Sequence, residues 1–390
     1  MVSAVLFITF FVLLVLNVPI SICLGLSSAA AILYSGTSLT IVATNIYSGI
    51  SKFLLLAIPF FVLSGNIMAK AGISTRLIRF VDTCVGHRKG GIANVCIIVA
   101  CFFGAISGSG PATVAALGAV LIPAMVERGG FSAPFSTALM ATASSIAIVI
   151  PPSIAFVVYA SITGVSIGDM FMAGIVPGIL MGLALIVVVM LEVRKNHVVP
   201  SNVQKASAKE RLDAFKDAFW GFLMPVIILG GIYGGIFTPT EAAAVSVVYG
   251  LFVGIFIYKE IKIKDLWDLM VDSAKTTGGI MLIVACASLF SFVCTRFGIS
   301  TAASELLARV AGNQFTFLLI CNIIFLIAGC FIDANSAMYI FIPIMLPVCK
   351  ALGYNVIAFG IMATVNLAIG QVTPPVGVNL FVAIGIKLRD

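Results

Sequence analysis

Two stretches of the chain combine oxygen-bearing side chains with glycine and proline, which could bind a cation beside an anion. The first is Ser107-Gly108-Ser109-Gly110-Pro111, and the second is Asp333-Ala334-Asn335-Ser336. Each precedes a Pro-Pro pair, Pro151-Pro152 and Pro374-Pro375, and the two pairs are about 223 residues apart. Backbone groups at such helix breaks lack partners within the helix, so they remain free to bind ligands.

Two cation sites are predicted at these breaks, because hard cations such as Na+ prefer oxygen ligands and helix ends present free carbonyls. The alternative is that glycine and proline here only permit close packing and kinks, since both are common in membrane helices. Several motifs in the same order in both halves favour the sites. The residues expected to hold the cations are Ser107, Ser145, Val149 and Pro151 in the first half and Gly329, Gly370, Thr373 and Val376 in the second.

An anionic substrate is expected at the same breaks, since helix N-termini carry partial positive charge. Arg296 and Asp333 are charges within apolar segments and are therefore functional candidates. Arg296 could bind a carboxylate through its planar guanidinium, and Asp333 could bind a cation or orient Arg296. Ser109 and Asn335 complete the expected substrate-binding set. The open alternative is that Arg296 and Lys70 extend to lipid headgroups, with Asp333 as a structural counter-ion.

The amino-acid composition indicates that membrane-spanning helices position these residues. Hydrophobic residues make up 61% of the 390 and charged residues only 9%, whereas soluble proteins carry about 25% charge. The chain is therefore expected to be an all-α polytopic membrane protein, embedded in the lipid bilayer. The net charge of +7 lies in a few loops and indicates membrane orientation rather than nucleic-acid binding.

The motifs of common enzyme classes are absent from the sequence. It contains no GxxxxGK[ST] motif for nucleotide phosphates and no G-x-S-x-G nucleophile motif. The nine cysteines include no CxxC pair, and with two histidines no metal cluster is expected. The chain is therefore predicted not to be an enzyme, and its energy source should be an ion gradient or another chain.

The motifs divide the chain into two repeats. The first is residues 1–195, a cytoplasmic linker covers 196–217, and the second repeat is 218–390. Each repeat should contain scaffold spans, an interfacial arm and transport elements. The scaffold spans are 1–36, 169–193 and 219–258, the arms are 38–50 and 262–276, and the transport elements are 53–166 and 278–386.

Charge placement predicts that the repeats are inverted. Lys and Arg cluster near residues 88–89, 194–216, 259–264 and 387–389, which the positive-inside rule assigns to the cytoplasm. Each repeat then crosses the membrane an odd number of times. The apolar stretches that contain the polar motifs become two re-entrant helical hairpins, each followed by a Pro-Pro-broken helix. The repeats would instead be parallel if residues 53–86, which break at Gly72, crossed twice.

Five motifs resemble the large membrane (permease) subunit of tripartite ATP-independent periplasmic (TRAP) transporters. They are residues 59–65, 107–113, 150–153, 237–242 and 372–377, and the resemblance covers the whole chain. It implies Na+-coupled uptake of a small organic acid (C4-dicarboxylate, sialic acid or sugar acid type) by an elevator mechanism. It places the chain in the bacterial inner membrane, with Na+ as the coupling ion and no organic cofactor.

The resemblance also implies two partners, a small four-helix TRAP membrane subunit and a periplasmic substrate-binding protein. Family members carry one more C-terminal helix, so the final scaffold helix of the second repeat is expected to be missing. One alternative is a stand-alone ion-coupled carboxylate carrier or antiporter that needs no binding protein. Another is a membrane scaffold or intramembrane enzyme in which the breaks are purely structural.

Overall fold

The computed structural model describes residues 1–195 and 205–386, and within them it contains eighteen α-helices and no strand. Eight helical segments of this part are long and apolar enough to cross a membrane, which confirms an all-α multi-pass membrane protein. Of the linker predicted at 196–217, residues 196–204 lie outside the described residues, and a helix already begins at Ala208.

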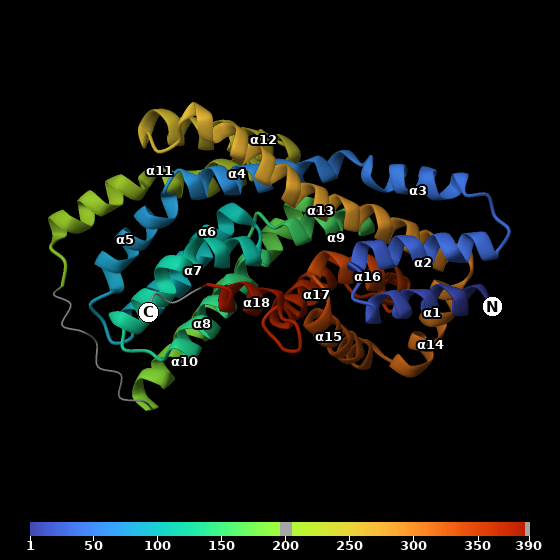
Figure 1. Ribbon diagram of the computed structural model, residues 1–390. Helices are drawn as coiled ribbons and strands as arrows, with labels where there is room; N and C mark the ends of the chain where they lie inside the picture. The colour runs from blue at the N-terminus through green and yellow to red at the C-terminus, as the bar shows by residue number, and fades with distance from the viewer. Residues whose placement is uncertain (196–204, 387–390) are drawn as a thin grey trace.

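The first half contains ten helices among the described residues, arranged as Figure 1 shows. They are α1 (Val2–Val15), α2 (Ile20–Tyr34), α3 (Thr40–Ile50), α4 (Ala57–Lys70), α5 (Ile73–Val85), α6 (Gly91–Ser107), α7 (Gly110–Glu127), α8 (Ala133–Ser145), α9 (Ile154–Thr163) and α10 (Ile167–Lys195).

The second half begins with two helices, followed by one very long helix and then shorter ones. They are α11 (Ala208–Tyr233), α12 (Pro239–Phe252), α13 (Ile263–Arg296), α14 (Ile299–Ala311), α15 (Gln314–Phe331), α16 (Ala334–Ala351), α17 (Val356–Gly370) and α18 (Val378–Ile384).

The halves repeat the same order of elements around matched glycine breaks. Gly72 ends α4 and Gly298 ends α13, and both have a φ of 71°, a left-handed conformation that glycine adopts without strain. The break is followed in each half by a 13-residue helix, α5 or α14. Next come two helical hairpins, α6–α7 and α15–α16, with tips at Gly108-Ser109 and Ile332-Asp333. How these hairpins enter the membrane stays a prediction.

No helix break marks one of the predicted boundaries. The arm expected at 262–276 and the span after it form a single helix, α13, of 34 residues, or about 50 Å at 1.5 Å per residue. In the first half, by contrast, the chain leaves helical geometry at Lys52, whose Nζ donates a hydrogen bond to the Ser161 carbonyl oxygen at 2.8 Å. The matching stretch of α13, Thr276-Thr277-Gly278-Gly279, stays helical.

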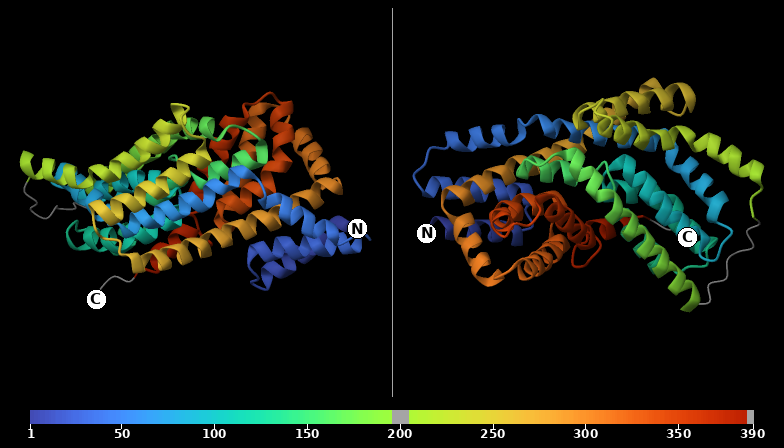
Figure 2. Two further views of the ribbon diagram at one scale, coloured as in Figure 1. Left: turned by 90° about the horizontal axis from the view of Figure 1, so that it is seen from above. Right: turned by 180° about the vertical axis from the view of Figure 1, so that it is seen from behind.

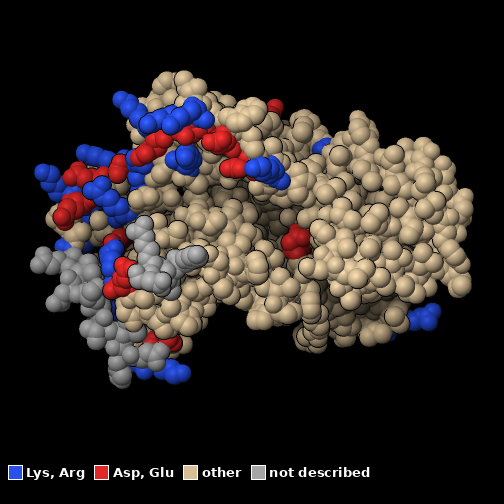
Figure 3. All heavy atoms as spheres, viewed as in Figure 1, with Lys and Arg blue, Asp and Glu red and all other residues tan. Residues whose placement is uncertain are grey.

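Helices α4, α11, α12 and α13 run along one edge of the molecule, and the hairpins and broken helices lie beside them (Figures 1 and 2). Charged side chains gather at one end of this face, over α5, α11 and the segment after α12, while most of the remaining surface is uncharged (Figure 3). This end also holds the connection after α5, one of the places where the sequence predicts a basic cytoplasmic loop.

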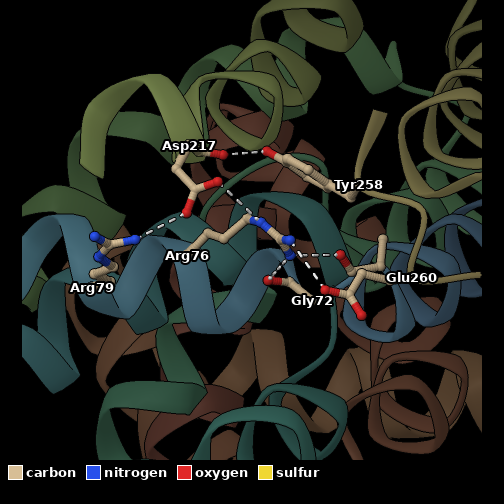
Figure 4. Close-up of polar contacts among 7 residues, drawn as sticks. Gly72, Arg76, Arg79, Asp217, Tyr258 and Glu260 are labelled. Carbon is tan, nitrogen blue, oxygen red and sulfur yellow. Dashed lines mark hydrogen bonds and ion pairs between the residues drawn. The ribbon is translucent and has the colours of Figure 1, made fainter. Parts of the chain in front are cut away.

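A cluster of charged residues joins α5 to α11 and to the segment after α12 (Figure 4). The Arg76 guanidinium lies 3.5 Å from Asp217 and 3.1 Å from Glu260, and its Nη1 donates to the carbonyl oxygen of Gly72 at 3.1 Å. It also stacks 3.9 Å from the ring centre of Tyr258, whose hydroxyl donates to the backbone carbonyl of Asp217 at 2.6 Å. Arg76 therefore links the glycine break at the start of α5 to α11 and to the segment after α12.

Candidate functional site

A cavity of about 320 Å³, mostly apolar with a few polar side chains, lies where the two hairpin tips meet α13. Both halves contribute to its wall, although the hairpin tips are more than 220 residues apart in the chain. Ser109, Asp333 and Asn335, three of the four predicted substrate-binding residues, all line it. The other polar lining residues are Thr276 of α13 and Gln371, which follows α17.

Four helices begin at this cavity. Pro111, Ile154, Ala334 and Val378, which line it, belong to the first turns of α7, α9, α16 and α18. The N-terminus of a helix presents partial positive charge and unpaired N–H groups, so it attracts anions. The convergence of several N-termini therefore suits a carboxylate or another small anion.

Asp333 caps the N-terminus of α16. Its carboxylate accepts hydrogen bonds from the backbone N–H groups of Asn335 at 3.0 Å and Ser336 at 3.2 Å, and from the Ser336 hydroxyl. Among the described residues that line the cavity, Asp333 is the acidic one and none is Lys or Arg. An anion bound here would be repelled by Asp333 unless a cation or a proton entered with it.

The structure does not bring Arg296 to this cavity. Arg296 is an exposed residue in the last turn of α13, roughly 20 Å along the helix from Ile283, which lines the cavity. Its guanidinium lies 6.0 Å from the ring centre of Phe292. Lys70, at the matching place in α4, lies 4.0 Å from Asp265 rather than near Asp333. A substrate-binding role for Arg296 stays a prediction and has no support from this geometry.

At the first predicted cation site, the hairpin tip and the broken helix meet, but the predicted ligands have different partners. The Ser107 hydroxyl lies 2.8 Å from that of Thr113 and closes the tip. The tip contacts the break through the Ile154 N–H, which donates to the Gly108 carbonyl at 3.4 Å. Ser145 instead donates to Thr142 within its own helix at 2.8 Å.

Two further predicted ligands of this site, Val149 and Pro151, are buried. The Val149 carbonyl faces α10, since a Cβ added at Gly174 would lie 2.6 Å from its oxygen. The structure therefore joins the predicted elements without turning all four predicted ligands toward one point. Sequence spacing located the break, whereas the direction of each carbonyl depends on packing against α10.

The four ligands predicted for the second cation site lie close together. A Cβ added at Gly370 would lie 2.4 Å from the Cα of Gly329, so the backbones of α15 and α17 are in direct contact. Thr373 donates its backbone N–H to the Gly370 carbonyl at 3.0 Å, and Val376 donates to Cys330, the neighbour of Gly329, at 3.1 Å. The exposed Pro374–Val376 segment gives this site a more open setting than the first.

The first half repeats this close approach. A Cβ added at Gly104 would lie 2.8 Å from the Cα of Ala147, so α6 contacts the turn before Pro151 as closely as α15 contacts α17. In each half, a glycine lets the first hairpin arm approach the backbone just before the Pro-Pro pair.

The sequence analysis missed two buried amides beside the hairpin tips. Gln371 is 4% exposed, and Asn379 is fully buried and donates to the Ala141 carbonyl at 3.4 Å. Both reach the tip of the first hairpin, because a Cβ added at Gly110 would lie within 3 Å of each side chain. Their signal was available: each is a polar residue in an apolar segment, on either side of Pro374-Pro375.

The fold and the cavity define a multi-pass helical membrane protein with a ligand-sized cavity between interrupted helices, the arrangement of a secondary transporter. A family model described as "Tripartite ATP-independent periplasmic transporter, DctM component" matches residues 7–388. The chain belongs to this family of large permease subunits, which confirms the resemblance in its motifs. It also confirms that the chain is a transport protein and not an enzyme.

Several curated proteins are similar over nearly the whole chain. The isethionate TRAP transporter permease protein DctMQ of Oleidesulfovibrio alaskensis is 43% identical over 383 residues, which are 98% of this chain and 60% of that protein. The C4-dicarboxylate TRAP transporter large permease protein DctM of Rhodobacter capsulatus is 40% identical, over 96% of this chain and 88% of its own. The 2,3-diketo-L-gulonate TRAP transporter large permease protein YiaN of Escherichia coli is 35% identical, with 94% and 88% coverage.

Proposed function

We propose that this chain is the membrane permease subunit of a binding-protein-dependent secondary transporter in the bacterial inner membrane. It takes up a small organic acid together with Na+. The observation that carries this proposal is the cavity at which the N-termini of α7, α9 and α16 meet beside Asp333. The N-termini favour an anionic solute, and the Asp333 carboxylate, which has no Lys or Arg beside it among the described lining residues, favours a cation that enters with the solute.

The relatives indicate the class of solute. They are named for isethionate, C4-dicarboxylates and 2,3-diketo-L-gulonate, all small and anionic. The family name supports two partners, a small membrane subunit and a periplasmic substrate-binding protein. An elevator movement is supported by the way the hairpins and broken helices share one cavity, while α1, α2, α11 and α12 contribute none of its lining among the described residues.

Uptake into vesicles tests this function. The permease, reconstituted with its small subunit, should accumulate a labelled carboxylate only with an inward Na+ gradient and the binding protein outside. Collapsing the Na+ gradient while keeping the proton gradient should reduce uptake at least about tenfold. Continued uptake would identify protons as the coupling ion, and uptake without the binding protein would support a stand-alone carrier.

Ser107→Ala should weaken Na+ dependence more than stability. The variant loses an oxygen at the hairpin tip, so the Na+ concentration for half-maximal uptake should rise about fivefold or more. The lost hydrogen bonds to Thr113 and Ser109, two of them long, together cost about 1–2 kcal/mol. Ser246→Ala is the matched control, since Ser246 is equally buried and bonds only to Ala243 within α12. An unchanged Na+ dependence in Ser107→Ala would remove this residue from the cation site.

A further inference from the structure

The cavity contains hydrogen-bond acceptors that have no partner. Gln371 is buried to 4% exposure, and its Oε1 makes no hydrogen bond with any described residue. The Oδ1 of Asn335 is likewise buried and without a partner. Both residues line the cavity. Because buried polar atoms are nearly always hydrogen-bonded in folded proteins, two unpaired acceptors on residues that line one cavity point to a ligand that donates a hydrogen bond or to a bound cation.

Gln371 is held in place from both sides. Its backbone N–H donates to Leu367 at 3.0 Å, and its carbonyl accepts from the Asn379 N–H at 3.0 Å. The side chain abuts the hairpin tip, since a Cβ added at Gly110 would lie 2.9 Å from Oε1. The Gln371 side chain is therefore fixed in position, because α17 and α18 hold its backbone and the first hairpin tip packs against its amide.

The two kinds of group in the cavity call for two kinds of group on the solute. The helix N-termini offer N–H donors to an anionic group, while Gln371 and Asn335 offer oxygens that can only accept. An unsubstituted dicarboxylate has no donor and would leave these oxygens unpaired. A hydroxylated acid satisfies both, because its hydroxyl can donate to an amide oxygen while its anionic group lies at the N-termini.

We propose that this permease selects small organic anions that carry a hydroxyl group, and that Gln371 determines this specificity by accepting a hydrogen bond from it. The proposal rests on the proposed function, because it assigns the solute class of the same cavity. Asn335 provides a second acceptor. Sites that hydrogen-bond a substrate hydroxyl discriminate strongly against analogues without one, since the buried partner is then left unpaired.

Binding to the purified permease in detergent with Na+ tests this with two matched pairs, malate with succinate and isethionate with ethanesulfonate. The members of each pair differ by one hydroxyl. Calorimetry should show the hydroxylated member binding at least about tenfold tighter in both pairs. In Gln371→Met the hydroxylated members should lose about tenfold, so that both members bind similarly. Gln371→Asn keeps the amide but shortens the side chain by one methylene, so it should lose the same preference. This more conservative variant tests the proposal even if Gln371→Met does not fold.

Gln314→Met is the matched control, because Gln314 lies at the start of α15 outside the cavity and donates to the Leu352 carbonyl. It should keep the preference. Equal binding within both pairs in the unaltered permease, or a preference retained by both Gln371 variants, would overturn the assignment. Tighter binding of succinate would also overturn it, by showing that the amide presents its nitrogen. If none of the four anions binds to the folded permease, the result contradicts the proposed function of the cavity itself and not only the assignment of Gln371.

Discussion

Gly370→Ala is expected to destabilise the protein by about 3 kcal/mol, at the upper end of the cost of overpacking a core. The added Cβ would lie 2.4 Å from the Cα and 2.6 Å from the carbonyl carbon of Gly329. Both are backbone atoms, so no side-chain rotation can relieve the overlap. Helices α15 and α17 must separate, which disturbs the second predicted cation site. The loss should appear as a lower melting temperature of the detergent-purified protein and as weaker Na+ binding.

Gly230→Ala is the matched control for this prediction. Gly230 lies within α11, and an added Cβ there meets no atom within 4 Å. Alanine also has the higher helix propensity, so the control should be neutral or slightly stabilising. If Gly370→Ala proved as stable as Gly230→Ala, the close approach of α15 and α17 would be wrong.

Arg76→Met should cost about 2 kcal/mol, since Arg76 is the buried member of this ion cluster and its removal leaves the partly exposed Asp217 and Glu260 without their shared cation. The Arg76 side chain is only 18% exposed, and its loss would leave Asp217 and Glu260 without the cation that joins them (Figure 4). The Tyr258 ring would also lose its stacked guanidinium. Thermal unfolding in detergent measures this loss of stability. Added salt should reduce the loss only slightly, because salt screens buried charges much less than exposed ones.

The neighbouring Arg79 supplies the comparison. It also pairs with Asp217, at 3.4 Å, but its side chain is 63% exposed. Exposed ion pairs contribute about 0–1 kcal/mol, so Arg79→Met should change the stability by less than half as much as Arg76→Met. Equal effects of the two variants would show that the cluster acts through general charge and not through the buried contacts of Arg76.

The sequence by itself determined where the helices are interrupted. Glycine at 72 and 298, the polar hairpin tips and the two Pro-Pro pairs mark breaks that the structure has at the expected residues. These breaks are local properties: glycine tolerates a positive φ, and proline lacks the N–H that a helix requires. The apolar composition likewise determined the all-helical membrane class, because lipid offers no partners for unpaired backbone groups.

Only the tertiary structure decided which side chains share the cavity. It brings Ser109, Asp333 and Asn335 together, adds Gln371, and leaves Arg296 at the exposed end of α13. Repeat spacing could match Arg296 to Lys70, but it carries no information on where the rotation and continuity of α13 direct either side chain. Burial and contacts across more than 220 residues depend on how whole helices pack, and no local motif encodes that arrangement.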